Sequence, residues 1–339
     1  MRQKRTTIQD VAKASQVSIS TISRFLHGRY ESMSETTKER IAQVISELNY
    51  KPNVLAQGLK GNITKTIAIV VVDISYPFCA SIIRSLSTIL TAADYRLIVS
   101  DSGGDKARER SILESLIAQQ VEGIIIQTNG DNNDLIKDIA KDLPVVIVDR
   151  QFDITNTINV VTNNQKASFE LTEHLFRAGY HDVVYVTEQI LGISTRQARL
   201  DGYEQACLQF KHKSIIAWVS KDNATSLEAA IQQIRNHAIE KPAAIYTANG
   251  LLMLPLYPLI RNEGWNIPEE LGLATFDEPD WACLITPPLT CVRQPTSEIG
   301  VLCGQAVLEA LEQNKNTQKV QIFTIPSIIT PRGSTLLNK

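Results

Sequence analysis

From residue 66 onward, short and almost entirely apolar runs alternate with longer segments whose apolar residues recur at helical spacing. A strand in a parallel sheet is buried on both faces and reads as a continuous apolar run, whereas a half-exposed strand alternates apolar with polar residues. The pattern therefore predicts helices layered on a parallel sheet in the order βαβαβαβ. The strands expected in this first series are 67–72, 97–99, 123–126 and 145–148.

A second series of the same kind follows. It opens with a helix over 165–178, and its expected strands are 183–186, 215–219, 244–246 and 271–274. The two series predict two α/β lobes, each built on a doubly wound parallel sheet. Ligands of such folds bind beyond the carboxyl ends of the strands, so we expect a ligand cleft between the lobes.

The first 60 residues differ from this body in charge. They carry ten Lys/Arg against five Asp/Glu, a net charge of +5, which leaves −7 for residues 61–339 of a chain whose total is −2. A basic end on an acidic body indicates a localised surface for nucleic acid.

Residues 18–27 read as a short helix suited to a DNA groove. A first helical pattern opens at Thr7, the chain breaks at Ser15-Gln16, and Ser18 can cap the second helix. Two short helices joined by a tight turn form the helix-turn-helix arrangement. In the second helix the inward residues are Ile22, Phe25 and Leu26, and the outward residues are Ile19, Ser20, Ser23 and Arg24.

The outward residues have the chemistry of base recognition. Arg24 can bond a guanine edge bidentately, a serine can bond base or phosphate, and Ile19 can contact a thymine methyl group. A third helix is expected from a cap at Ser34 to Leu48, with apolar positions spaced to cover the first two helices. The N-terminal segment is therefore predicted to be an all-α helix-turn-helix headpiece.

Three segments of the headpiece carry a family resemblance: Thr-Thr-Ile-Gln-Asp-Val-Ala from Thr6, Val-Ser-Ile-Ser-Thr-Ile-Ser-Arg from Val17 and Leu-Asn-Tyr-Lys-Pro-Asn from Leu48. They resemble the DNA-binding headpiece of the lactose-repressor (LacI/GalR) family over residues 5–60. The family usually has Gly where this chain has Gln16, and a positive φ at a residue other than Gly costs about 1 kcal/mol. The residues expected to contact DNA are Thr7, Ser18, Ile19, Ser20, Thr21, Ser23, Arg24, His27, Tyr50, Asn53, Ala56 and Leu59.

The resemblance also implies a mechanism. Residues 53–60 would form a hinge helix only on operator DNA, and the paired hinges of a homodimer would insert Leu59 into the minor groove. An apolar wedge of this kind unstacks a base step and bends the duplex. A segment this short does not hold a helix alone in water, so its folding would depend on the operator.

The resemblance continues more loosely to the C-terminus. Its landmarks are residues 73–78, Val148-Asp149-Arg150, Arg199-x-x-Gly202-Tyr203, Asn249, Phe276-Asp277 and residues 331–335. It implies a helix-turn-helix domain over 1–52, a hinge and linker over 53–64, and an effector-binding and dimerisation domain over 65–339. The implied lobes, of the periplasmic-binding-protein type, are 65–162 with 292–322 and 163–291 with 323–339.

In the family, the corresponding positions line the effector pocket, and their chemistry suits a polyol or sugar acid. Carboxylates and amides exchange hydrogen bonds with hydroxyls, an arginine pairs with a hydroxyl or carboxylate, and Phe78 can pack on a ring or carbon chain. Two pairs depart from the family pattern, Asn163-Asn164 and Asn249-Gly250, and residues 250–260 are unusually apolar. The residues expected to contact the effector are Ser75, Phe78, Asp149, Arg150, Thr195, Arg199, Asn249 and Asp277.

Other classes of protein are less consistent with the sequence. It contains no G-x-S-x-G elbow, no P-loop and no G-x-G-x-x-G after the first strand, so an enzyme is not expected. A carbohydrate-binding protein of the periplasmic type and an activator-type regulator remain alternatives, since both share the two-lobed body. The headpiece and the lack of a signal peptide favour a regulator over a periplasmic protein.

Cysteine and histidine spacing indicates neither disulfides nor metal. The five cysteines are scattered and include no C-x-x-C, which is typical of reduced thiols in a cytoplasm. No apolar run reaches 18 residues, so no membrane span is expected. We expect no cofactor and no metal.

The sequence therefore predicts a cytoplasmic transcriptional regulator, most consistent with a repressor of carbohydrate-utilisation genes. It would bind double-stranded operator DNA as a homodimer under allosteric control by a small sugar, sugar acid or sugar phosphate. Arg150, Arg196 and Arg199 lie close to expected strand ends and favour an anionic ligand over a neutral one. The resemblance implies that effector binding would change the angle between the lobes and separate the hinges.

Overall fold

The computed structural model describes residues 6–26, 28–30, 33–50, 64–238, 241–313 and 319–337. The chain divides into two compact units, Met1–Thr64 and Lys65–Lys339. They are the headpiece and the body.

The headpiece contains α1 (Ile8–Ala14), α2 (Ile19–Leu26) and α3 (Glu35–Glu47). Thr7 and Asp10 form a reciprocal capping box at the start of α1, and Ser34 caps α3 by accepting a hydrogen bond from the Thr37 amide. The core gathers apolar residues of all three helices around Val11, Ile22 and Ile41, none of which is exposed. Gln16 has a φ of 54°, so the turn between α1 and α2 requires the left-handed conformation that the sequence predicted.

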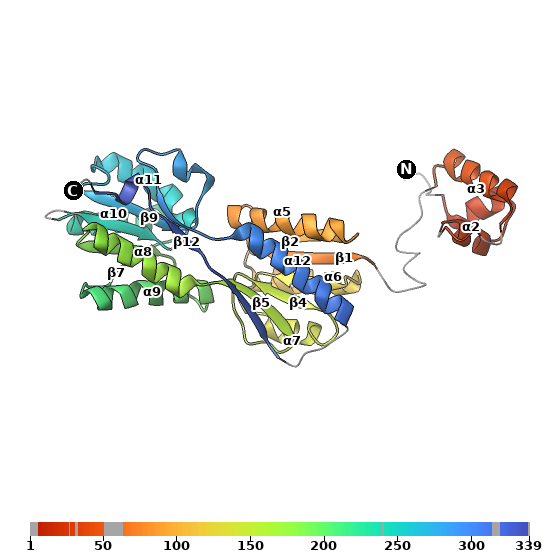
Figure 1. Ribbon diagram of the computed structural model, residues 1–339, viewed down its shortest axis with the longest axis horizontal. Coiled ribbons are helices and arrows are strands. Elements are labelled where there is room, and N and C mark those ends of the chain that lie inside the picture. The colour runs from red at the N-terminus through yellow and green to blue at the C-terminus, as the bar shows by residue number, and fades with distance from the viewer. Residues whose placement is uncertain are drawn as a thin grey trace. The chain divides into compact units, whose positions relative to one another are not determined.

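The first lobe of the body is built on a parallel six-stranded sheet in the order β11-β5-β4-β3-β1-β2 (Figure 1). Its strands are β1 (Thr66–Val71), β2 (Arg96–Asp101), β3 (Gly123–Ile126), β4 (Val145–Val148), β5 (Thr157–Thr162) and β11 (Gln321–Ile325). Along β1, Ile67 and Ile69 pack with α5 (Pro77–Ala92) and α12 (Thr296–Gln313). The alternate residues Ala68 and Val70 pack with α6 (Lys106–Ala118) and α7 (Asn133–Ile139) on the other face.

The second lobe repeats this plan in the strand order β12-β10-β9-β8-β6-β7. Its strands are β6 (Asp182–Thr187), β7 (Ile215–Trp218), β8 (Ala243–Thr247), β9 (Leu271–Phe276), β10 (Thr290–Arg293) and β12 (Ile328–Thr330). One face carries α8 (Asn164–Ala178) and α9 (Ser194–Phe210), and the other carries α10 (Ala224–His237) and α11 (Gly250–Glu263). The sheet is parallel except for β12, which runs antiparallel to β10.

Close packing of α8 on α9 depends on a glycine. A Cβ at Gly202 would lie 2.1 Å from the Gln165 carbonyl oxygen, so any larger residue would push the two helices apart. This contact fixes the relative position of the two helix N-termini, both of which face the first lobe.

Three connections join the lobes, after β5, after β10 and after β11. The borders differ from the sequence prediction: β10 stays in the second sheet through Arg293, and β11 stays in the first sheet through Ile325, rather than ending at 291 and 322. Backbone pairing sets these borders, which lie within a few residues of those that the resemblance implied.

Candidate functional site

The N-terminus of α2 presents a connected group of hydroxyls. Ser18 Oγ accepts a hydrogen bond from the Thr21 amide at 3.1 Å and lies 2.6 Å from Ser20 Oγ and 2.9 Å from Thr21 Oγ1. Ser18 is therefore the cap of α2. The adjacent hydroxyls are held at the end of the helix that a helix-turn-helix protein directs at base edges.

One side of α2 is buried and the other is available for contact. Ile22 is fully buried, whereas the side chain of Ile19 is 46% exposed and Ser20 and Arg24 are also exposed. An exposed isoleucine beside hydroxyls and a guanidinium is consistent with the predicted groove-facing surface.

Three of the other predicted DNA contacts lie at a helix cap, in a half-buried position or in the headpiece core. Thr7 is exposed and caps α1, while Ser23 is half-buried. Tyr50 packs in the headpiece core and is 9% exposed. The remaining predicted contacts, His27, Asn53, Ala56 and Leu59, lie outside the described residues.

In the body, Asp277 follows β9 and lies between the lobes. Its Oδ2 accepts a hydrogen bond from the hydroxyl of Tyr76, which precedes α5 in the first lobe, and its Oδ1 accepts one from Gln294 Nε2. The Gly250 amide is 3.5 Å from Oδ2, and Arg199 Nη1 is 4.0 Å away. Both carboxylate oxygens are therefore already bonded to protein donors.

Arg199 is almost completely buried behind this carboxylate. Its Nε donates to Asn164 Oδ1 at 2.8 Å, its Nη1 donates to the Ala248 carbonyl at 2.9 Å, and the guanidinium lies 3.7 Å from the centre of the Phe276 ring. Burial alone would lower its pKa, but Asp277 and Asp149 raise the pKa above the usual value. Arg199 is thus a fixed cation that orients Asn164.

Asp149 is the equivalent aspartate of the first lobe, following β4. Its Oδ2 accepts a hydrogen bond from Gln127 Nε2 at 2.8 Å. Burial raises its pKa above the usual value, although Arg150 and Arg199 act in the opposite direction. The neighbouring Arg150 donates to Asn129 through Nη1, and its buried Nε has no hydrogen-bond partner.

The remaining predicted effector residues do not form one group: they lie at a helix cap, in an exposed loop, in the core of the first lobe and in the first turn of α9. Asn249 caps α11 by accepting a hydrogen bond from the Leu252 amide at 3.1 Å. Ser75 is exposed and bonded to Asp73, and Phe78 belongs to the first lobe's core. Thr195 is buried in the first turn of α9.

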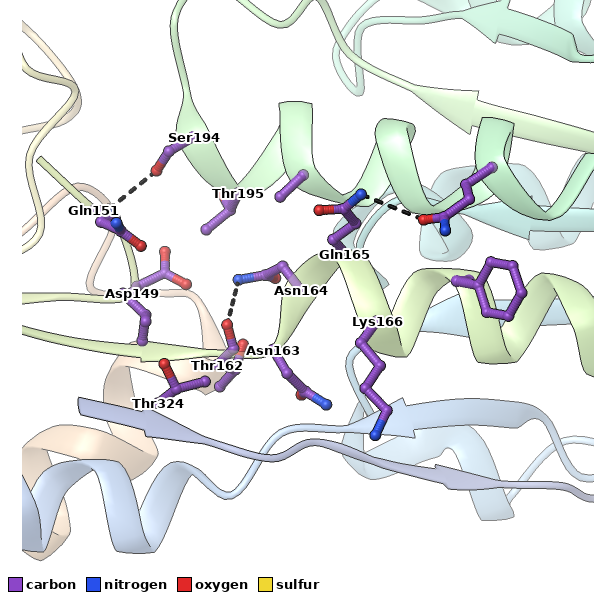
Figure 2. A pocket seen from close by; sticks show the side chains of 14 residues that line it. Asp149, Gln151, Thr162, Asn163, Asn164, Gln165, Lys166, Ser194, Thr195 and Thr324 are labelled. Carbon is purple, nitrogen blue, oxygen red and sulfur yellow. Dashed lines mark hydrogen bonds between the residues drawn. The ribbon is translucent and has the colours of Figure 1, made fainter. Parts of the chain in front are cut away.

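A cavity of about 500 Å³, lined mainly by polar residues, lies between the lobes beside the connection that follows β5 (Figure 2). Asp149, Asn164 and Thr195 point toward one another across it, and Lys166 points away. The backbone N–H of Gln151 donates a hydrogen bond to Ser194 Oγ at 3.1 Å and so links the two lobes. The lining residues are Asp149, Gln151, Val161, Thr162, Asn163, Asn164, Gln165, Lys166, Phe169, Ser194, Thr195, Ala198, Gln205 and Thr324.

Four of the predicted effector residues thus fall into two groups. Asp149 and Thr195 line the cavity, whereas Arg199 and Asp277 belong to the bonded cluster behind Asn164. Sequence reasoning missed Tyr76, Gln127 and Gln294. Tyr76 lies within the loop over 73–78 that had already been singled out, but nothing in the sequence indicated the two glutamines.

Within the described residues, no group of three or more His, Cys, Asp or Glu side chains could hold a metal ion. None of the helices in that part of the chain is long and apolar enough to span a membrane.

Comparison with known proteins agrees with the two-unit architecture. Residues 7–53 match the family model described as bacterial regulatory proteins, lacI family. Residues 64–330 match the model described as periplasmic binding proteins and sugar binding domain of LacI family. Together the two models cover most of the chain.

Individual relatives extend over nearly the whole length. The transcriptional regulator KdgR of Bacillus subtilis is 32% identical, covering 91% of this chain and 92% of the relative, and PtxS of Pseudomonas putida is 30% identical over 98% and 96%. The ribose operon repressor of Haemophilus influenzae is 28% identical over 91% and 93%.

Solved structures show the same fold. The lac repressor dimer bound to operator and the anti-inducer ONPF superposes with a TM-score of 0.81 at 22% identity, covering 98% of this chain and all of that one. With the two family models and the full-length relatives, this establishes that the chain belongs to the lacI family of bacterial regulatory proteins, which are DNA-binding transcriptional regulators.

Proposed function

We propose that this regulator is a cytoplasmic repressor of carbohydrate-utilisation genes whose hold on its operator is set by a small carbohydrate. The observation that carries the proposal is the polar cavity between the lobes, in a chain that also presents the hydroxyls and guanidinium of α2. A relative named as a ribose operon repressor supports a carbohydrate as the effector.

The cavity has the chemistry of a site for hydroxyl groups. Asp149 accepts hydrogen bonds, Thr195 both donates and accepts, and the Asn164 amide is held in place by Arg199. Arg196 is already paired with Glu188, and Arg199 lies next to Asp277. With Arg196 and Arg199 already paired, an anionic ligand is no longer favoured over a neutral one. We therefore propose a polyhydroxylated ligand that is either neutral or anionic.

For the DNA, we propose that α2 reads base edges through Ser20 and Arg24, with Ile19 in apolar contact. The proposed hinge over 53–60, with Leu59 as its wedge, lies outside the described residues. A symmetric dimer would place two copies of α2 on the two halves of an operator.

Two exposed leucines support the dimer, Leu254 of α11 and Leu284 directly after the short helix η2 (Asp280–Cys283). Leu254 is 56% exposed and Leu284 is 80% exposed, and the two elements meet where the Tyr257 and Trp281 ring centres lie 6.3 Å apart. Exposed apolar surfaces of this kind mark interaction sites, and we propose that a second copy covers this one. A Leu254→Asp, Leu284→Asp double variant should sediment as a monomer at concentrations where the wild type is a dimer.

The test of function is a fluorescence-anisotropy titration on an operator selected from random-sequence DNA, with scrambled DNA as the control. The titration is repeated with D-ribose, D-glucose, D-gluconate and D-glucose 6-phosphate at a fixed salt concentration. We expect selective operator binding and a shift in its affinity with at least one of these compounds. Carbohydrate binding without selective DNA binding would instead favour a carbohydrate-binding protein, and selective DNA binding that no carbohydrate shifts would contradict the effector class.

A further inference from the structure

The segments that join the lobes are very short. Since β5 ends at Thr162 and α8 begins at Asn164, the first connection is Asn163 alone. The second, between β10 and α12, is Gln294-Pro295, and the third, between β11 and β12, is Pro326-Ser327. A rotation of one lobe against the other has to be absorbed by the backbone of these few residues.

Two hydrogen bonds tie the connections to one another at the end of β5. The Thr162 hydroxyl donates to Gln294 Oε1 at 3.1 Å and links the first connection to the second. The Ser327 backbone N–H donates to Asn163 Oδ1 at 2.7 Å and links the third connection to the first. Thr162, Gln294 and Ser327 are buried, where a hydrogen bond is stronger than in water.

Asn163 uses its side chain for this tie rather than for a local cap. It is the N-cap residue of α8, a position where asparagine commonly accepts a hydrogen bond from the first turn, yet its side chain makes no such bond. Because a backbone N–H can only donate, the atom that faces Ser327 must be the carboxamide oxygen. The buried Ser327 hydroxyl has no hydrogen-bond partner, so Asn163 holds the third connection by its backbone.

The same residue belongs to the wall of the cavity. Asn163 lines the cavity together with Thr162 and with Thr324, which shortly precedes the third connection. Its side chain is directed toward the chain segment that follows Thr324 (Figure 2). A molecule in the cavity would therefore adjoin the residues that a lobe rotation has to bend.

We propose that Asn163 is a positioning residue for lobe rotation. Its carboxamide makes the first and third connections bend as a unit, and its place in the cavity wall couples a bound ligand to the angle between the lobes. The ligand part of this inference rests on the proposed function, whereas the tie between the connections does not. It follows that removing the carboxamide loosens the lobes at contacts that Asn163 does not itself make.

The first experiment measures hydrogen exchange in the full-length chain with no carbohydrate added. The reporter is the backbone N–H of Gln151, whose bond to Ser194 Oγ crosses from one lobe to the other. Asn163→Ala should speed this exchange about fivefold, the factor that corresponds to one hydrogen bond of ordinary net strength. Asn163→Asp keeps an acceptor for the Ser327 N–H, so its exchange at Gln151 should match the wild type.

A matched control separates lobe rotation from the loss of one bond. Asn223 Oδ1 accepts a hydrogen bond from the Ser226 N–H at 3.2 Å within the second lobe, so Asn223→Ala removes the same kind of bond away from the connections. This variant should leave exchange at Gln151 unchanged. If Asn163→Ala speeds exchange at Ser327 but not at Gln151, the tie does not control the lobes and the proposal is overturned. Equally fast exchange at Gln151 in Asn163→Asp and Asn163→Ala would also overturn it, because the acceptor would then not matter.

The second experiment measures operator affinity by fluorescence anisotropy, with and without D-gluconate or D-ribose at saturation. At saturation the ratio of the two affinities no longer depends on how tightly the probe binds, so it reports the coupling alone. We expect this ratio to be closer to one by at least about twofold in Asn163→Ala, and to be unchanged in Asn223→Ala. A wild-type ratio in Asn163→Ala overturns the ligand part. If neither probe shifts the operator affinity of the wild type, the proposed effector class fails for both compounds and the ligand part fails with it, while exchange at Gln151 still decides the tie.

Discussion

Asp149 and Asp277 occupy equivalent positions in the two lobes and yet have different surroundings. Each follows a buried strand of its sheet, and each has a left-handed backbone, with φ of 69° and 71°. Asp277 is bonded through both oxygens to donors from other segments. Asp149 has one side-chain hydrogen bond, from Gln127, and lines the cavity.

The difference shows that position at a strand end does not by itself assign a role. A left-handed conformation at a residue other than Gly is strained and persists only where the surroundings determine it. At Asp277 the surroundings are protein groups that join the lobes, so the carboxylate contributes to structure. At Asp149 part of the surroundings is a cavity, and we propose that its carboxylate contacts a ligand there.

The largest expected effect is on stability. Asp277→Ala leaves Arg199 buried with only the more distant Asp149 to balance it, and removes the acceptor for Tyr76 and Gln294. Removing one partner of a buried ion pair typically costs about 3–5 kcal/mol, so we expect a loss in this range in urea unfolding of the body. Asp149→Ala should lose much less. Equal losses would show that the two aspartates are structurally equivalent.

Operator affinity should depend on Arg24 of α2 and not on Asp149 or Asp277. Arg24→Ala should weaken operator binding by about 1–3 kcal/mol while ligand affinity and stability stay unchanged. Titrations on operator and scrambled DNA at one salt concentration measure the effect. An equal loss on both DNAs would mean that Arg24 contacts only phosphate.

For ligand affinity, the aspartate with the larger expected effect is Asp149, whereas for stability it is Asp277. Asp149→Asn keeps the shape of the side chain but weakens a charged acceptor, so we expect at least a tenfold higher Kd for the carbohydrate that shifts operator binding. The measurement is calorimetry, with Asp138→Asn as the matched control, since Asp138 is an exposed aspartate of α7 outside the cavity. If Asp149→Asn binds as tightly as the wild type, Asp149 is not in the effector site.

The sequence predicted the parts of this arrangement that depend on local pattern. Continuous apolar runs identified the central strands β1, β3 and β4 because these strands are buried on both faces. The edge strand β11 was missed, since its side chains are largely exposed. The caps at Ser18 and Ser34 were predicted because capping requires only residues a few positions apart.

The partners of the two aspartates could not be predicted in this way. Tyr76 reaches Asp277 only because three separate connections bring the two lobes together, and no pattern within a segment encodes that contact. Gln294 likewise becomes a partner through its place in one of these connections. The family resemblance and their places at strand ends therefore identified the carboxylates, and only the tertiary structure showed that Asp149 lines the cavity.

The smallest expected effect is a pH dependence of opposite sign at two carboxylates. Burial raises the pKa of Asp149 above its usual value of 3.8, so its contribution to stability is fully present below that value and is lost as pH rises through the folded pKa. Asp182 differs. Burial would raise its pKa, but hydrogen bonds with His237 and His181 lower it, so its contribution is present above 3.8 and is lost as pH falls through the folded pKa. The measurement is the free energy of unfolding of the wild type minus that of Asp149→Asn or Asp182→Asn, as a function of pH. The difference should fall with rising pH for Asp149 and increase for Asp182, and two curves of the same sign would show that Asp149 is solvated rather than held at the wall of the cavity.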